Sequence, residues 1–235
     1  MLAAAASPPP PSGPPDLIGS VVDPDPASGV NQPLLALTLP GGVSVGDFCA
    51  LLMASSGALD PPAGWDPSTI LATLTPTASA GRLTLIGGPL LPADVAAGVI
   101  EVPTTGGLNL RIAGCGEVCG PAVVDALVVD PINSNGTSTT SPSCTPTTDV
   151  RLLRGYGCLV NLAAAGPCTW LTPDGLAQDS NPSMSLRNCT CALSDVVFAG
   201  DGVTPTGTAT APSVDALAAP LAIQRQALTL ALRRP

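Results

Sequence analysis

Short apolar runs separated by turn residues fill most of this chain, and they constrain the fold more than any other feature. From residue 34 onward the runs are bounded by Gly, Pro, Asp and Ser. Runs of this length and composition predict β-strands. The expected strands are 34–39, 48–54, 69–75, 82–87, 98–102, 108–114, 122–130, 150–157, 158–163, 183–193 and 195–200.

The remaining segments add little helix to this pattern. Residues 90–98 predict one short helical turn, and residues 201–213, rich in Thr and Gly, predict a solvated strand pair. The last 19 residues predict a final strand, with a short helix as the alternative. Many short strands with almost no long helical pattern indicate an all-β fold, a two-sheet antiparallel β-sandwich of jelly-roll type.

Two segments of the chain are similar to one another. Residues 42–65 and 148–176 each place an aspartate before an apolar strand and then reach a loop that contains a tryptophan and proline. We therefore expect a sandwich domain over 34–235 with two similar halves, about 34–132 and 144–235.

Residues 1–33 differ from the rest because they are rich in Pro, Ser and Asp and lack periodicity. The run of prolines at 8–11 favours polyproline II, so this segment is expected to form an extended arm. Two interpretations remain open: a disordered tail, or an arm that lies on a neighbouring subunit.

Charge and hydropathy exclude several classes of partner. The net charge is −9, and all eight basic residues are arginines, so no basic surface for a phosphate backbone is expected and nucleic-acid binding is disfavoured. No run reaches the roughly 18 apolar residues of a membrane span, so no membrane insertion is expected. The first residues lack a basic n-region, so we expect no secretion signal. The chain is then expected either to stay in the cytoplasm where it is made or to leave by another route, such as packaging into a particle released by lysis.

The usual parts of a catalytic site are scarce. The chain has no histidine, which removes the commonest general base and metal ligand, and only two glutamates. We expect no enzyme activity, no cofactor and no metal. The enzymatic alternative is a glycosidase, which needs two carboxylates about 5–9.5 Å apart in a cleft. Its candidates are Asp60, Asp66 and Asp174.

Eight cysteines leave three alternatives open: disulfides, a zinc site built from the pairs at 115/119 and 189/191, or buried thiols. Structural zinc prefers two knuckles of x2–4 spacing, which the second pair does not have. An even count on a chain expected outside the cell favours disulfides. Cys158 and Cys168 bracket a hairpin-sized loop and are the first candidate pair.

The two tryptophans each allow a structural and a binding role. In the turn at 60–65, two prolines and Gly64 predict that Trp65 folds back onto a sheet as a buried corner, with a sugar-stacking platform as the alternative. Trp170 has the same alternatives. With Tyr156 it is the candidate glycan contact.

Several motifs, taken in order, resemble a β-sandwich module of tailed bacteriophages, especially those of actinobacteria. The first is VSVGD-x3-LLMASSGALDPPAGW, followed by LTLIGGPLLPADVAAGVIEV. VRLLRGYGCLV with CTWLTPDGL, and GVTPTGTATAP with ALTLALRRP, complete a resemblance that spans roughly 34–235. The eight cysteines and the segment CTWLTPDGL depart from the pattern.

The resemblance implies a virion structural protein on the surface of a phage head or tail. Such proteins are minor tail proteins, fibre domains or capsid decorations, and they carry no catalytic residues. The implied partners are other virion proteins and further copies of this chain, which it would reinforce by docking. The alternative is a carbohydrate-binding adhesion module of the tail that contacts host surface glycans.

Overall fold

The computed structural model describes residues 13–23, 33–75, 82–107, 112–134, 138–160, 189–200, 202–204, 206–210 and 223–235. Nearly all of the regular structure in these ranges is antiparallel strand, which confirms the all-β prediction. The one α-helix in them, α1 (Pro92–Ala97), occupies the predicted helical turn and ends at Gly98, whose φ of 65° is left-handed. No helix in these ranges is long and apolar enough to cross a membrane.

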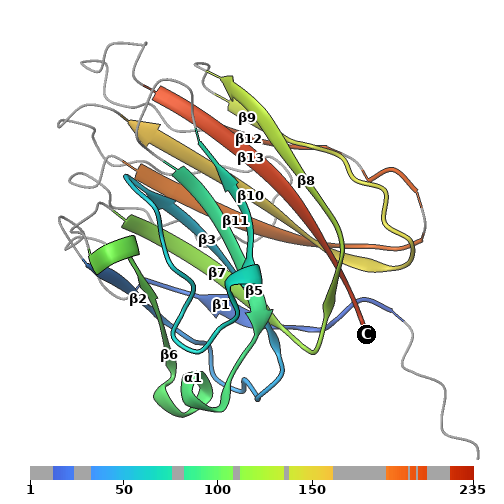
Figure 1. Cartoon of the computed structure of the whole chain (residues 1–235). Coiled ribbons are helices and arrows are strands. Elements are labelled where there is room, and N and C mark those ends of the chain that lie inside the picture. Colours follow the sequence, from blue (N-terminus) through green and yellow to red (C-terminus); the bar gives the residue numbers. More distant parts are fainter. Residues whose placement is uncertain are drawn as a thin grey trace, which may run out of the picture.

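The first half of the chain builds a five-stranded sheet in the order β1-β7-β3-β5-β4 (Figure 1). All its neighbours are antiparallel. Its strands are β1 (Leu17–Val21), β3 (Phe48–Ser55), β4 (Ile70–Leu74), β5 (Arg82–Pro89) and β7 (Ile112–Cys119). The 3-10 helix η1 (Pro67–Thr69) leads into β4.

The second half builds a four-stranded antiparallel sheet in the order β11-β10-β13-β8. Its strands are β8 (Val123–Ser134), β10 (Val150–Val160), β11 (Cys189–Phe198) and β13 (Ile223–Arg233). The alternation of Leu228, Leu230 and Leu232 therefore belongs to a strand, and the helical alternative for the last residues is wrong.

Two antiparallel ribbons of two strands complete the described fold. One pairs β2 (Leu34–Thr38) with β6 (Val99–Pro103), which is followed by η2 (Thr105–Gly107). The other pairs β9 (Ser138–Ser141) with β12 (Gly207–Thr210). Each half of the chain thus contributes one large sheet and one ribbon.

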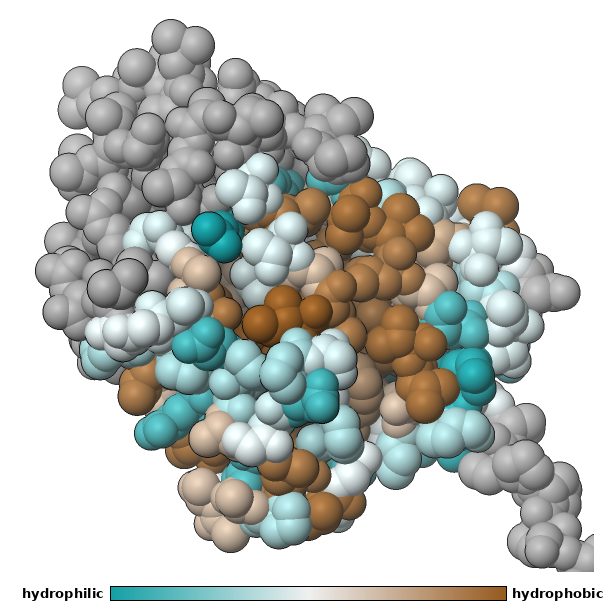
Figure 2. Space-filling view, in the orientation of Figure 1, coloured by the Kyte–Doolittle hydropathy of each residue, from teal (hydrophilic) through white to brown (hydrophobic). Residues whose placement is uncertain are grey.

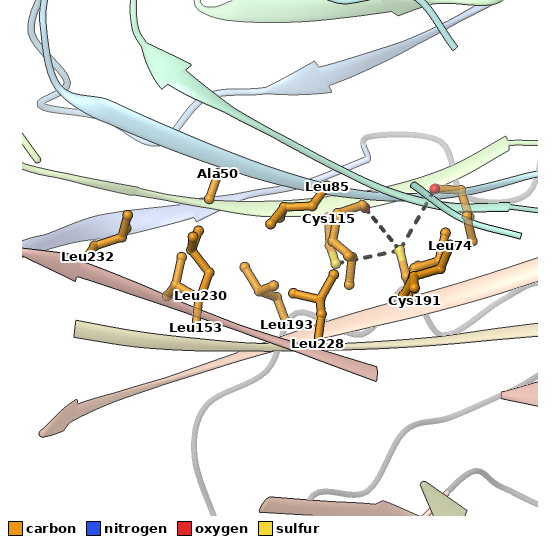
Figure 3. Close-up of a cluster of buried hydrophobic side chains, with 14 of the residues drawn as sticks. Ala50, Leu74, Leu85, Cys115, Leu153, Cys191, Leu193, Leu228, Leu230 and Leu232 are labelled. Carbon is orange, nitrogen blue, oxygen red and sulfur yellow. Dashed lines mark hydrogen bonds between the residues drawn. The ribbon is translucent and has the colours of Figure 1, made fainter. Parts of the chain in front are cut away.

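The two large sheets share a hydrophobic core between their facing surfaces (Figure 3). β3 supplies Ala50, Leu52 and Ala54, and the four-stranded sheet supplies leucines from β10, β11 and β13. The other face of β3, including Leu51 and Met53, packs against the β2–β6 ribbon. Since both faces of β3 are covered, all eight of its residues are buried, which explains its uninterrupted apolar sequence.

Glycines allow the two large sheets to approach closely. A Cβ at Gly157 of β10 would lie 2.5 Å from Leu83 Cδ1 in the facing sheet, and one at Gly155 would lie 3.0 Å from Leu52 Cδ2. The Gly-Tyr-Gly sequence, which predicted the end of one strand and the start of another, therefore lies inside the single strand β10.

The predicted boundaries need correction. Residues 17–21, assigned to the N-terminal arm, form the edge strand β1, so the folded domain begins before residue 34. β8 belongs to the second sheet although most of it lies in the predicted first half. The chain also completes the five-stranded sheet before it enters the other one. This order does not confirm the jelly-roll type, which stays a prediction.

Candidate functional site

The turn that carries Trp65 is a buried corner of the first half. Trp65 is 7% exposed and packs with residues of β2, β3 and β6. Its Nε1–H donates to Asp94 Oδ2 at 2.9 Å, and the same oxygen accepts from the Leu91 N–H at 2.8 Å. The corner role predicted for Trp65 is confirmed. The alternative role, a sugar platform, is wrong because the indole has almost no exposed surface.

A hollow of about 290 Å³ lies beside this corner, lined in part by Pro62, Asp94 and Glu101. Asp94, the buried carboxylate in its lining, lies in the first turn of helix α1. It already accepts hydrogen bonds from Trp65 Nε1–H and from the Leu91 N–H. The hollow is therefore built around a carboxylate that holds two segments of the chain together.

The first-half candidates for a glycosidase also serve local structure. Asp60 Oδ1 accepts from Thr105 Oγ1 at 3.0 Å, which ties the turn to η2. Asp66 caps η1 through the Ser68 N–H at 2.8 Å, and its hydrogen bonds from Ser68 lower the pKa of its carboxyl. Asp174 lies outside the described residues.

The glycan contact predicted for Tyr156 is not supported by its position. Tyr156 is 0% exposed and lies in the middle of the four-stranded sheet, on β10. Stacking on a sugar requires an exposed ring face, so this part of the prediction is corrected. Trp170, its proposed partner, lies outside the described residues.

Two arginines of the second half hold the segment that leads into β1, a feature that the sequence analysis missed. Arg151 Nε donates to the Pro15 carbonyl at 2.8 Å, and its guanidinium also pairs with Asp195. Arg234 Nε donates to the Pro14 carbonyl at 3.0 Å, and its Nη2 pairs with Asp16 at 2.9 Å. Residues 14–16 are therefore fixed to this chain's own domain beside residue 234.

A cavity of about 210 Å³ lies where the segment before β1 meets the residues after β13. It is lined by Pro15, Asp16, Gly120, Pro121, Arg234 and Pro235. The only sequence signal for this contact was the Arg233-Arg234 pair. The partners of Arg234, Pro14 and Asp16, lie 220 and 218 positions away in the sequence, so this pairing could not be inferred from spacing.

The edge strand β8 carries the most continuous apolar surface on the face shown in Figure 2. Leu127 and Val129 extend the core between the sheets, and Val128 extends a second cluster on the outer face of the four-stranded sheet. These residues are half-buried, and Val124 is 38% exposed. One edge of β8 pairs with β13, and no strand of the described sheet pairs with its other edge. Such an edge is a template for contact with another chain.

Five of the cysteines, Cys49, Cys115, Cys119, Cys144 and Cys191, are buried thiols in this structure. Burial raises the pKa of Cys49 and raises that of Cys119 to about 12. No group of three or more metal-binding side chains occurs among the described residues, so the zinc alternative gains no support there. The predicted disulfide Cys158–Cys168 stays a prediction, because Cys168 and the side chain of Cys158 lie outside the part of the chain that the structure describes.

No family model, no curated protein and no solved structure matches this chain.

Proposed function

We propose that this chain is a non-enzymatic structural protein of a bacteriophage virion, displayed on the particle surface. In this proposal it acts as a minor tail protein or a capsid decoration protein, and it docks to and reinforces neighbouring subunits. The supporting observation is that the motifs of the phage resemblance that lie within the described residues fall on strands and turns that build the fold.

The Gly-Asp motif illustrates this point. Asp47 Oδ2 accepts from the Ser44 N–H at 2.6 Å, and the Asp47 carbonyl accepts from the Leu90 N–H at 2.8 Å. The motif thus sets the turn before β3 and fastens it to the end of β5. In the same way the PPAGW turn supplies the Trp65 corner, and the PAD motif supplies Asp94, its hydrogen-bond partner.

Later motifs occupy the other sheet. VRLLRGYGCLV is β10, and the terminal ALTLALRR lies in β13 and continues into Arg234, which binds Pro14 and Asp16. A resemblance carried by core strands and their turns supports a shared architecture. The jelly-roll type belongs to this proposal, and an experimental structure that describes residues 161–188 and 211–222 tests it.

Immunogold electron microscopy on purified virions tests the location. Label on the head would support a decoration protein, and label on the tail would support a minor tail protein. Label at the tail tip would also favour the alternative, a carbohydrate-binding adhesion module, for which Trp170 is the remaining candidate glycan contact. Particles without label, in a lysate that contains the chain, would overturn the virion proposal.

The edge strand β8 supports docking to a neighbouring subunit, and a matched pair of variants tests that contact. Val124→Asp places a charge on β8, whereas Val197→Asp places one on β11, the opposite edge strand of the same sheet, where Val197 is 51% exposed. We expect only Val124→Asp to reduce incorporation into particles. Equal incorporation of both variants would remove β8 as the docking edge while leaving the location test intact.

A further inference from the structure

Two cysteines from opposite sheets face one another in the core. Cys115 lies on β7 of the five-stranded sheet, and Cys191 lies on β11 of the four-stranded sheet. Their Sγ atoms are 3.6 Å apart, although the residues are 76 positions apart in the sequence. Figure 3 shows both sulfurs directed into the space between the sheets.

The surroundings hold these two side chains in place. Cys191 Sγ lies 3.3 Å from the Leu52 carbonyl and 3.8 Å from the Ala113 carbonyl, both on the facing sheet. Both cysteines belong to the hydrophobic cluster between the sheets and are buried. Their sulfurs are in contact, so a modest closing movement brings them to the bonding distance of about 2.05 Å.

We propose that Cys115 and Cys191 are an oxidative cross-linking site that joins the two large sheets through a disulfide. The proposal does not depend on the virion assignment. It uses neither Cys158 nor Cys168, so the predicted disulfide between those two cysteines stays a separate prediction.

The reaction is a thiol–disulfide exchange with a low-molecular-weight disulfide such as oxidised glutathione. The Cys115 thiolate attacks one sulfur of that disulfide, forms a mixed disulfide and releases one small thiolate. The Cys191 thiolate then attacks Cys115 Sγ, forms the Cys115–Cys191 bond and displaces the second small thiolate. The two cysteines lose two electrons, which reduce the oxidant, and their two protons protonate the released thiolates.

The other buried thiols of the described residues are placed differently. Cys49 lies on the opposite face of its sheet, in the cluster with Trp65. Cys144 Sγ contacts Thr204 Oγ1 at 3.7 Å, at the outer cluster of the four-stranded sheet. Cys119 shares the inner face with Cys115 but lies at the far end of β7. The geometry therefore selects Cys115 as the partner of Cys191.

Peptide mapping of the full-length chain identifies the link. The native chain, and the chain refolded from denaturant, are incubated with oxidised glutathione, unfolded, alkylated with iodoacetamide and digested. Cleavage after arginine and glutamate isolates Cys115 in residues 112–117 and separates it from Cys119 and Cys144. The peptide 188–225 carries Cys189 and Cys191, and the peptide 155–187 carries Cys158 and Cys168.

We expect 112–117 linked to 188–225 in the oxidised chain. Cys115→Ala and Cys191→Ala should abolish this link, whereas the matched controls Cys119→Ala and Cys189→Ala should retain it. The link should also raise the midpoint of thermal unfolding by on the order of 10 °C relative to the reduced chain.

Two results would overturn the proposal. One is full alkylation of Cys115 and Cys191 after oxidation by both routes. The other is a Cys115 link to a peptide other than 188–225, or one that survives Cys191→Ala. Fragmentation of the linked wild-type peptide in the mass spectrometer assigns the bond to Cys189 or to Cys191, and a bond at Cys189 would also overturn the proposal, so an alanine variant that fails to fold does not remove the test.

Discussion

Each large sheet has a two-stranded ribbon on its outer face, but the described contacts that hold the two ribbons differ. The β2–β6 ribbon packs through Leu35, Leu37, Ile100 and Val102 against the apolar outer face of the five-stranded sheet. Around the β9–β12 ribbon, polar contacts recur. Thr229 Oγ1 donates to the Pro142 carbonyl at 2.6 Å.

A further polar contact ties the segment before β12 to the segment after β9. The Cys144 N–H donates to Thr204 Oγ1 at 3.0 Å, and the Thr204 N–H donates to the Cys144 carbonyl at 2.9 Å. Among the described residues, the apolar cluster at this outer face is smaller, with Cys144, Val150, Leu152 and Ala231 as its buried members. Among the described contacts, the first ribbon is thus held mainly by apolar packing and the second by more hydrogen bonds.

The largest effect is expected from the apolar ribbon. Leu37→Ala removes a fully buried side chain of β2 from the cluster that holds the ribbon, and it should lower the free energy of unfolding by about 2–5 kcal/mol. Urea denaturation measures this loss. Leu17→Ala, on the edge strand β1 where Leu17 is 41% exposed, is the control and should change stability far less. Equal losses of stability for both variants would contradict the conclusion that apolar packing holds the β2–β6 ribbon.

The Trp65 corner tests whether the first half also depends on one polar contact. Trp65→Phe keeps an aromatic ring but removes the N–H that binds Asp94 Oδ2, which leaves a buried carboxylate with one donor fewer. The expected loss is about 1–3 kcal/mol in the free energy of unfolding.

Double-mutant analysis with Asp94→Asn separates this hydrogen bond from the loss of ring volume. A coupling energy near zero between the two substitutions would show that Trp65 acts through packing alone.

Several strands of the first half could be predicted from the sequence because their apolar residues form continuous or alternating runs. The run 48–54 is apolar at every position, and β3 is indeed covered on both faces. Strands β2, β4, β5 and β6 likewise coincide with their predicted runs within two residues at each end. Burial on both faces, or alternation on one, is a local property that the residues themselves carry.

Elements held by backbone pairing or polar contacts were missed. β1 is flanked by prolines and pairs on one side only, a position where prolines are tolerated nearby. β9 lies in a Ser- and Thr-rich segment outside every predicted strand, although it pairs in register with β12. In both strands the pairing partner, distant in sequence, determines the structure.

The candidate site was less predictable than the fold. The residues chosen for possible chemistry have structural roles in the described part of the chain. Asp60 binds Thr105 and Asp66 caps η1, whereas Trp65 and Tyr156 are buried. The Cys115–Cys191 contact was missed because it depends on the register of two strands in different sheets. Sequence spacing favoured a local pair instead.

Hydrogen bonding around the second ribbon gives a smaller expected effect. Thr229→Val keeps the shape of the side chain but removes its donor to the Pro142 carbonyl, and it should lower the free energy of unfolding by about 1 kcal/mol. Thr73→Val, at an exposed position of β4, is the matched control and should be close to neutral. If Thr229→Val is as stable as the wild type, the hydrogen bond from Thr229 to the Pro142 carbonyl does not stabilise the packing of the β9–β12 ribbon.

The smallest effect concerns the pH dependence of the second half. Burial raises the pKa of Asp125, but the hydrogen bonds from Thr147 and the nearby Arg233 guanidinium outweigh this and lower it below its ordinary value. Asp125 thus stabilises the folded chain above the ordinary pKa of about 3.9, and this contribution is lost as the pH falls through the lower folded value. Thr147→Val removes the hydroxyl donor to Asp125 Oδ1, so it should shift this loss to higher pH. Urea denaturation between about pH 2 and 6 measures the shift, and identical pH profiles for the wild type and the variant would contradict the role of Thr147.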